Sequence, residues 1–384
     1  MGLTSKKLLA LALLAAFLIF AGIVWLWPRL AGRGVRRVLG RIGSLLLTQV
    51  LMITALGLFL NQYFGFYGSW DDLLGTAHEP VTVTGHDALA KPGLRVTGSR
   101  RMATAGADVP SVAGRIEEVT IRGAASGITS SGYVYLPPEY FQRAYATRKF
   151  SSVLVLTGYP GVTLALIKGL QYPQIEHRLI AQGKMPPTVL VMMRPTLVPP
   201  RDTECMDIPK GPRTETFFTR DLTQLVSGHY RVGVQARDWG VMGDSTGGYC
   251  ALKMTMRHPR AFSAAVGLSP SYRAPIDLTT GDLFGGSKRL KSENNLMWRL
   301  GHKPSPPVSL LVTSSRHGEH DYKATMHFIQ KIKQLDERGA PTHVFSIILG
   351  TGGHNFNTWR REIPAALEWL GGRLDGPASV REVR

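Results

Sequence analysis

A serine in the segment Gly-Asp-Ser-Thr-Gly, residues 243–247, has the sequence surroundings of a nucleophile. The hydrophobic residues 239–242 precede it, and apolar residues at helical spacing follow at 249–254, which predicts a strand, a sharp turn and a helix. Small residues flank the serine because its backbone is strained in such a turn. The turn would expose the Ser245 hydroxyl and aim the N-terminus of the helix at a substrate oxygen.

A nucleophilic serine needs a base, and His354 is the best candidate among the eleven histidines. It follows Gly352 and Gly353, after an apolar run at 344–349 that predicts a strand. A helix is expected next, over residues 363–374. A histidine on a glycine-rich loop after the last strand is where the base of a Ser, acid, His sequence should lie.

The acid of such a triad should follow the preceding strand, expected at 308–313. Glu319 and Asp321 both lie shortly after it. Either carboxylate would hold the imidazole in one tautomer and stabilise the imidazolium. The residues alone leave the choice open, and both could instead be solvated carboxylates of a loop.

Stabilising an oxyanion requires two backbone N–H donors. Thr246, which follows the serine, should supply one of them. The second should come from the loop 157–161, where Tyr159 is preferred because Pro160 has no N–H. The alternative is that this loop is an ordinary Gly-Pro turn.

The pattern of strands and helices that must position the serine, the histidine and the acid predicts an α/β-hydrolase fold. Between most of the later strands lie helical stretches such as 164–182 and 216–227, an alternation that favours a mostly parallel sheet covered by helices. Eight strands are expected, at 116–122, 133–136, 152–157, 188–194, 238–242, 264–269, 308–313 and 344–349.

From about residue 116 to residue 374 the chain resembles the putative-esterase family of α/β-hydrolases, which includes esterase D (S-formylglutathione hydrolase), enterochelin-type esterases and actinobacterial mycolyltransferases. The matching segments are 134–138, 214–217, 243–248, 257–259 and 353–355. The resemblance implies Ser245 as nucleophile, His354 as base, and the N–H groups of Tyr159 and Thr246 as oxyanion hole. In the family the acid precedes a helix like that expected at 323–335, and this spacing favours Glu319 over Asp321.

The chain departs from the family at Asp244 and Thr246 and in the long segment 195–213, which leaves the substrate class open. The resemblance implies a serine esterase or an acyltransferase of the mycolyltransferase type. A non-catalytic hydrolase-fold module that binds an envelope partner is a third hypothesis. No cofactor is expected, and no metal site, although His317 and His320 lie near Glu319 and Asp321.

The N-terminal part carries a separate signal. Residues 8–27 form an uncharged run long enough to span a bilayer, and 42–60 form a second uncharged apolar run. The first could be a signal peptide, but bulky residues end it and no small-residue cleavage site is evident there. The second could be a buried amphipathic helix. We expect two transmembrane helices.

Charge predicts how these helices are oriented. Five arginines and no acid lie between them, so that loop should be cytoplasmic and the catalytic domain extracytoplasmic. Of the net charge of +18, the basic residues of 1–66 supply +7. The rest is spread out and no nucleic-acid motif is present, which favours an anionic membrane or envelope nearby, or simply a solvated basic surface.

The sequence contains two cysteines, Cys205 and Cys250. An even count fits an oxidising compartment, where they would form a disulfide that tethers the segment after the fourth expected strand; two free thiols are the alternative. We expect a membrane anchor at 1–67, a linker at 68–115, the catalytic domain at 116–374 and a disordered tail at 375–384.

Overall fold

The computed structural model describes residues 5–32, 34–64, 70, 91–101, 109–199 and 201–374. The chain divides into two compact units, Met1–Glu79 and Pro80–Arg384. The expected tail at 375–384, and much of the expected linker, lie outside the described residues.

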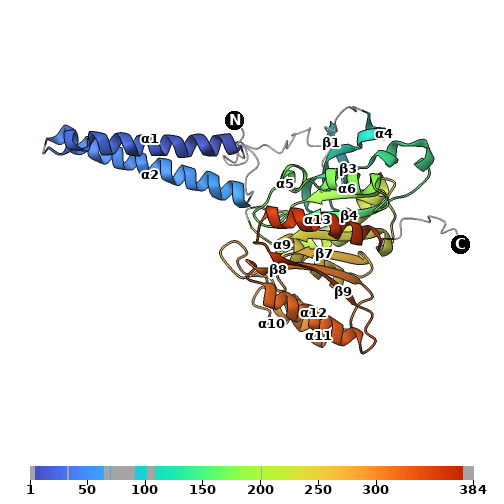
Figure 1. Ribbon diagram of the computed structural model, residues 1–384. Coiled ribbons are helices and arrows are strands. Elements are labelled where there is room, and N and C mark those ends of the chain that lie inside the picture. Colours follow the sequence, from blue (N-terminus) through green and yellow to red (C-terminus); the bar gives the residue numbers. More distant parts are fainter. Residues whose placement is uncertain are drawn as a thin grey trace. The chain divides into compact units, whose positions relative to one another are not determined.

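The first unit is a pair of long helices, α1 (Lys6–Leu30) and α2 (Val35–Phe64), which pack against each other (Figure 1). The expected helices 8–27 and 42–60 lie within them. Large apolar side chains cover their outer surfaces: Phe17 and Trp25 are 67% and 71% exposed. Both helices are long and apolar enough to cross a membrane, a property that signal sequences share.

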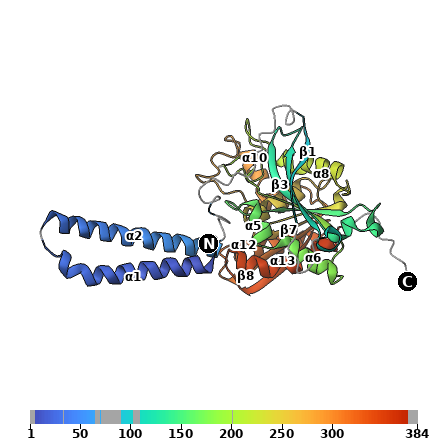
Figure 2. The same ribbon diagram turned by 90° about the horizontal axis from the view of Figure 1, so that it is seen from above.

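The second unit is built on a nine-stranded sheet in the order β1-β2-β3-β5-β4-β6-β7-β8-β9 (Figures 1 and 2). β1, β2, β3 and β5 pair in antiparallel fashion, whereas β5, β4, β6, β7, β8 and β9 are parallel neighbours. The strands are β1 (Gly93–Arg101), β2 (Arg115–Arg122), β3 (Thr129–Leu136), β4 (Ser151–Leu156), β5 (Thr188–Met193), β6 (Trp239–Asp244), β7 (Ala264–Leu268), β8 (Ser309–His317) and β9 (His343–Thr351).

The expected mostly parallel sheet is confirmed, but the expected count of eight strands is wrong. The ninth strand is β1, which lies in the segment expected to be a linker and pairs with β2. β1 is an edge strand whose residues are mostly exposed, and its large apolar residues are only Leu94 and Val96. It therefore lacks the alternating apolar pattern that marks a strand in a sequence.

Helices cover both faces of the sheet, and adjacent residues of one strand point to opposite faces. Leu154 and Leu156 of β4 pack in the core under α8, α9, α11 and α12, whereas Val153 and Val155 pack in the core under α5, α6 and α13. The helices of this unit are α4 (Pro110–Ala113), α5 (Thr163–Lys168), α6 (Tyr172–Ala181), α7 (Thr214–Thr216), the π-helical η3 (Phe217–Leu222), α8 (Thr223–His229), α9 (Thr246–Arg257), α10 (Lys288–Glu293), α11 (Leu296–His302), α12 (Tyr322–Asp336) and α13 (Phe356–Gly371).

Two expected helices have different bounds. The stretch 164–182 is split into α5 and α6 at Gly169, whose added Cβ would lie 2.9 Å from the ring of Phe356. The last helix begins at Phe356 rather than 363, because the side chain of Asn355 accepts the N–H groups of Asn357 and Thr358 and caps it.

Candidate active site

Ser245 occupies the sharp turn between β6 and α9. Its φ of 52° lies in the left-handed region, and close packing of its neighbours enforces that conformation. A Cβ on Gly243 would lie 2.5 Å from the backbone of Gly247, and a Cβ on Gly247 would lie 2.5 Å from the carbonyl oxygen of Leu156. Only glycine fits at either position, so β4, β6 and α9 together hold the serine at the C-terminal edge of the sheet.

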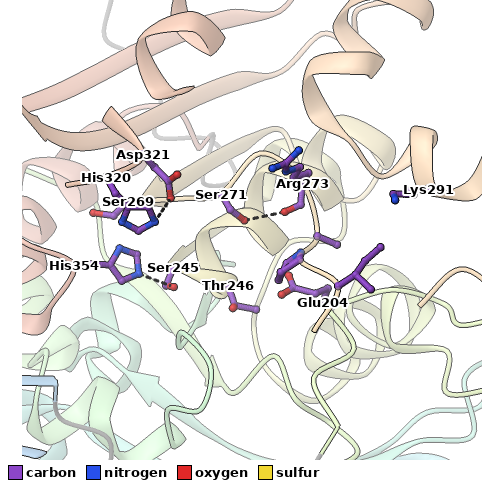
Figure 3. A pocket seen from close by; sticks show the side chains of 13 residues that line it. Glu204, Ser245, Thr246, Ser269, Ser271, Arg273, Lys291, His320, Asp321 and His354 are labelled. Carbon is purple, nitrogen blue, oxygen red and sulfur yellow. Dashed lines mark hydrogen bonds and ion pairs between the residues drawn. The ribbon is translucent and has the colours of Figure 1, made fainter. Parts of the chain in front are cut away.

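His354 follows β9 and meets the serine at that edge. Its Nε2 lies 2.8 Å from Ser245 Oγ, which is hydrogen-bond distance. The Trp359 ring of α13 stands nearly perpendicular to the imidazole at a centroid distance of 5.2 Å and limits its rotation. Ser245 and His354 point toward each other across the site (Figure 3).

Of the two candidate acids, Glu319 contacts the histidine. Its Oε2 lies 3.3 Å from His354 Nδ1, and its side chain is 1% exposed. Asp321 instead pairs with Nε2 of His320 at 3.1 Å, and its side chain is 35% exposed. The structure thus brings together Ser245, His354 and Glu319, and Asp321 lies outside this chain of contacts.

A second layer of side chains fixes Glu319. The Ser269 hydroxyl donates to Glu319 Oε1 at 2.7 Å and accepts from Trp359 Nε1 at 3.0 Å. Ser269 follows β7, and its N–H donates to the Thr313 hydroxyl, which in turn donates to Glu362 Oε2 at 2.7 Å. These residues were not predicted from the sequence, although Ser269, the last residue of the expected strand 264–269, lies at the same edge of the sheet as Ser245 and His354.

Glu362 is a second buried carboxyl behind Glu319. Burial, with the nearby charge of Glu319 as a further cause, raises the pKa of Glu362 to about 8. Burial thus favours the neutral form of Glu362 near neutral pH. A carboxylate at Glu319 would stabilise an imidazolium at His354.

The loop 157–161, expected to supply an oxyanion donor, lies against Ser245. A Cβ on Gly158 would lie 3.1 Å from Ser245 Cβ. The loop is closed by the Gly161 N–H, which donates to the Gly158 carbonyl at 2.9 Å. Tyr159 follows Gly158 in this loop, and Thr246 follows Ser245 as the first residue of α9. The role of both residues as donors stays a prediction.

Asp244 ties this loop to the elbow. Its Oδ2 accepts the Gly158 N–H at 2.8 Å. Burial raises the pKa of Asp244 to about 7, an effect that the hydrogen bond from Gly158 opposes. Asp244 therefore acts on the site through the position of the loop.

A cavity of about 460 Å³ opens beside the serine. Ten of its thirteen lining residues are polar or charged and three are apolar. The lining residues are Glu204, Ser245, Thr246, Ser269, Ser271, Arg273, Ala274, Pro275, Ile276, Lys291, His320, Asp321 and His354 (Figure 3). Among the residues that the structure describes, no group of three or more His, Cys, Asp or Glu side chains is placed to hold a metal ion.

The segment after β5 forms part of this cavity's wall. A disulfide joins Cys205 of that segment to Cys250 of α9, with the two Cα atoms 5.7 Å apart. Lys253, one turn further along α9, donates to the carbonyl oxygens of Glu204 and Cys205 at 2.7 and 2.8 Å. The segment is therefore fastened to the helix that begins at the nucleophile.

Comparison with known proteins agrees with this architecture. The family model described as Putative esterase matches residues 126–370. An uncharacterized protein of Corynebacterium glutamicum is 21% identical over 281 residues, which cover 68% of this chain and 62% of that protein.

Two solved structures share the fold at low sequence identity. An S-formylglutathione hydrolase from Agrobacterium tumefaciens has a TM-score of 0.56 and 13% identity, covering 73% of this chain and 99% of its own. The fluorophosphonate-binding serine hydrolase F of Staphylococcus aureus has a TM-score of 0.53 and 15% identity, covering 67% of this chain and 98% of its own. With the family model matching more than half of its length, the chain belongs to the Putative esterase family of α/β-hydrolases.

The contacts of Glu319 and Asp321 predict unequal losses of kcat when each carboxylate is replaced by its amide. Glu319→Gln should lower kcat for a short-chain ester by on the order of 10⁴, because the amide cannot supply the charge that stabilises the imidazolium. Asp321→Asn, the matched control, should lower kcat by less than about tenfold. Steady-state kinetics of both variants provide the measurement, and the reverse order would exclude Glu319 as the acid.

The raised pKa of Asp244 predicts a pH-dependent stability difference. Between pH 4 and pH 7 the unfolded chain releases the Asp244 proton while the folded chain keeps it, so this residue makes the wild type less stable as pH rises. Asp244→Asn lacks that titration and should gain stability relative to the wild type by about 4 kcal/mol across this range.

Unfolding of both full-length proteins in detergent, from pH 4 to pH 8, measures this difference. Groups that the two proteins share cancel in the comparison. A difference in free energy of unfolding that stays constant with pH would contradict the raised pKa.

Proposed function

We propose that the protein is a serine esterase that cleaves carboxylic esters through an acyl-enzyme on Ser245. The observation that supports this most directly is the chain of contacts from Ser245 Oγ to His354 Nε2, 2.8 Å, and from His354 Nδ1 to Glu319 Oε2, 3.3 Å. The family, and a structural relative described as fluorophosphonate-binding, support the same chemistry.

In the proposed first half-reaction, Ser245 Oγ attacks the ester carbonyl while His354 Nε2 takes its proton. Glu319 stabilises the resulting imidazolium. The N–H groups of Tyr159 and Thr246 receive the oxyanion of the tetrahedral intermediate. The C–O bond to the alcohol then breaks, the alcohol takes the proton from His354, and the acyl group stays on Ser245.

In the second half-reaction, water attacks the acyl-enzyme as His354 removes its proton. The second tetrahedral intermediate collapses, the carboxylic acid leaves, and the proton returns to Ser245. If an alcohol replaces water, the same steps transfer the acyl group. The polar and charged side chains in the cavity wall support this alternative acyltransferase function, because a hydroxylated acceptor could bind to them.

We further propose that α1 and α2 anchor the enzyme in the cell membrane with the catalytic domain outside the cytoplasm. Both helices have the length and hydropathy of membrane spans, and the short connection between the apolar runs is rich in arginine, which favours the cytoplasmic side. The ester substrate would then be a component of the cell envelope, or a compound that reaches it.

The proposed nucleophile predicts the behaviour of an activity-based probe. Ser245→Ala should abolish labelling by a fluorophosphonate and reduce ester turnover to background, because no other hydroxyl contacts His354 Nε2 among the described residues. Ser305→Ala, a serine in the loop after α11, is the matched control and should label like the wild type. Labelling that persists in Ser245→Ala would remove this serine from the role.

The proposed orientation predicts the activity of reporter fusions. A reporter that works only outside the cytoplasm should be active when fused after Trp70 and silent when fused after Arg37, because the arginine-rich connection should stay inside. An expression blot of both fusions controls for their amounts. An active Arg37 fusion together with a silent Trp70 fusion would place the enzyme in the cytoplasm.

A further inference from the structure

Glu204 places a buried carboxyl group on the wall of the cavity that holds the nucleophile. The residue is 1% exposed and lies on the same wall as Thr246 (Figure 3). Its Oε2 has no hydrogen-bond partner within the described part of the chain. A buried polar group without a partner is costly unless a ligand satisfies it.

The nearby cation Lys253 forms no ion pair with this carboxyl group, and its charge opposes the effect of burial on the pKa of Glu204 without overcoming it. The ammonium group of Lys253 donates to the backbone oxygens of Glu204 and Cys205, and lies 4.0 Å from the carboxylate of Glu215. Burial, followed by the charge of Asp202, raises the pKa of the Glu204 carboxyl well above its usual range. A protonated carboxyl can both donate and accept a hydrogen bond.

The backbone around Glu204 is held in place. Glu204 and Cys205 have φ values of 48° and 49°, in the left-handed region, and the disulfide to Cys250 fastens them to α9. The N–H of Glu204 donates to Asp202 Oδ1 at 3.0 Å, and the N–H of Asp202 donates to the carbonyl of Thr279 at 3.1 Å. The side chain is thus presented to the cavity by a rigid support.

The surroundings indicate which ligand group would bind. Arg273 and Lys291 line the same cavity, and neither forms an ion pair with a carboxylate of the described residues. Asp321 is the acidic residue on the opposite side, and it pairs with His320. Two cations in the cavity wall disfavour an ammonium group there. The unpartnered Glu204 carboxyl can exchange hydrogen bonds with a hydroxyl group, which is therefore the ligand group that fits it.

We propose that Glu204 is a specificity-determining residue that hydrogen-bonds a hydroxyl group on the polar portion of the ester substrate. This inference rests on the proposed esterase function of Ser245. It predicts that the enzyme prefers esters of hydroxylated alcohols over esters of alkyl alcohols with the same carbon skeleton. A site that pairs with a substrate hydroxyl discriminates because its buried polar group is left unpaired by the analogue that lacks it.

Two butyrate esters provide a matched test, glyceryl monobutyrate and propyl butyrate. The measured quantity is the ratio of their kcat/KM values, determined with the full-length protein in detergent. Glu204→Ala should lower the wild-type ratio about tenfold, as expected for the loss of one hydrogen bond in a buried site. Glu204→Gln, which can still donate and accept, should keep the ratio within about threefold.

Two further variants act as controls. Glu204→Met removes the polar group but fills a similar volume, so it should lower the ratio like alanine and remains informative if alanine unfolds the segment. Glu337→Ala changes an exposed glutamate just after α12 and should leave the ratio unchanged.

The outcomes separate this inference from the proposed function. A wild type that neither reacts with a fluorophosphonate nor hydrolyses either ester would overturn both. Labelling at Ser245 without hydrolysis of either ester would overturn the inference alone. A ratio that stays within twofold in Glu204→Ala and Glu204→Met, or an equal loss on both esters, would also overturn the inference, because the role would then be structural.

Discussion

The left-handed backbone of Ser245 is the constraint on which the rest of the site depends. Such a conformation costs a residue with a side chain about 1–3 kcal/mol and persists only where its surroundings impose it. Gly243 and Gly247 impose it here by packing against each other and against the end of β4. Because β6 is a central strand, the serine emerges where β8 and β9 also end, and residues that follow those strands can reach it. The proposed acid, Glu319, and the proposed base, His354, therefore meet the serine through the order of the sheet.

The buried carboxyls near the serine differ in their partners and in their distance from the imidazole. Glu319 receives a hydroxyl hydrogen bond from Ser269 and faces His354. Glu362 receives one hydroxyl hydrogen bond from Thr313, and burial beside Glu319 raises its pKa to about 8. Burial thus favours the neutral form of the carboxyl behind Glu319, and Glu319 is the carboxyl that faces the imidazole.

The sequence predicted the parts of this protein that follow from local patterns. All eight expected strands are present, since each contains an apolar run; these runs are buried in the sheet except in the edge strand β9, which is partly exposed. The contact between Glu319 and His354 is in line with the choice that helix spacing favoured. β1 escaped prediction because its sequence, with only Leu94 and Val96 as large apolar residues, lacks an apolar period. Glu204, which belongs to a long segment without regular structure, could not be assigned a place before the structure connected that segment to α9.

The fold separates the groups proposed for the chemistry from those proposed for recognition. The proposed triad lies on loops after β6, β8 and β9, whereas Glu204 lies on the segment after β5. That segment contains little regular structure, so its order depends on its attachment to α9 through the Cys205–Cys250 disulfide. The bridge closes a loop over a separation of 45 residues, which in the chain-entropy model stabilises the fold by about 4 kcal/mol. Because disulfides persist in oxidising compartments, the cavity wall would keep its shape on the extracytoplasmic side, where we propose that α1 and α2 hold the enzyme.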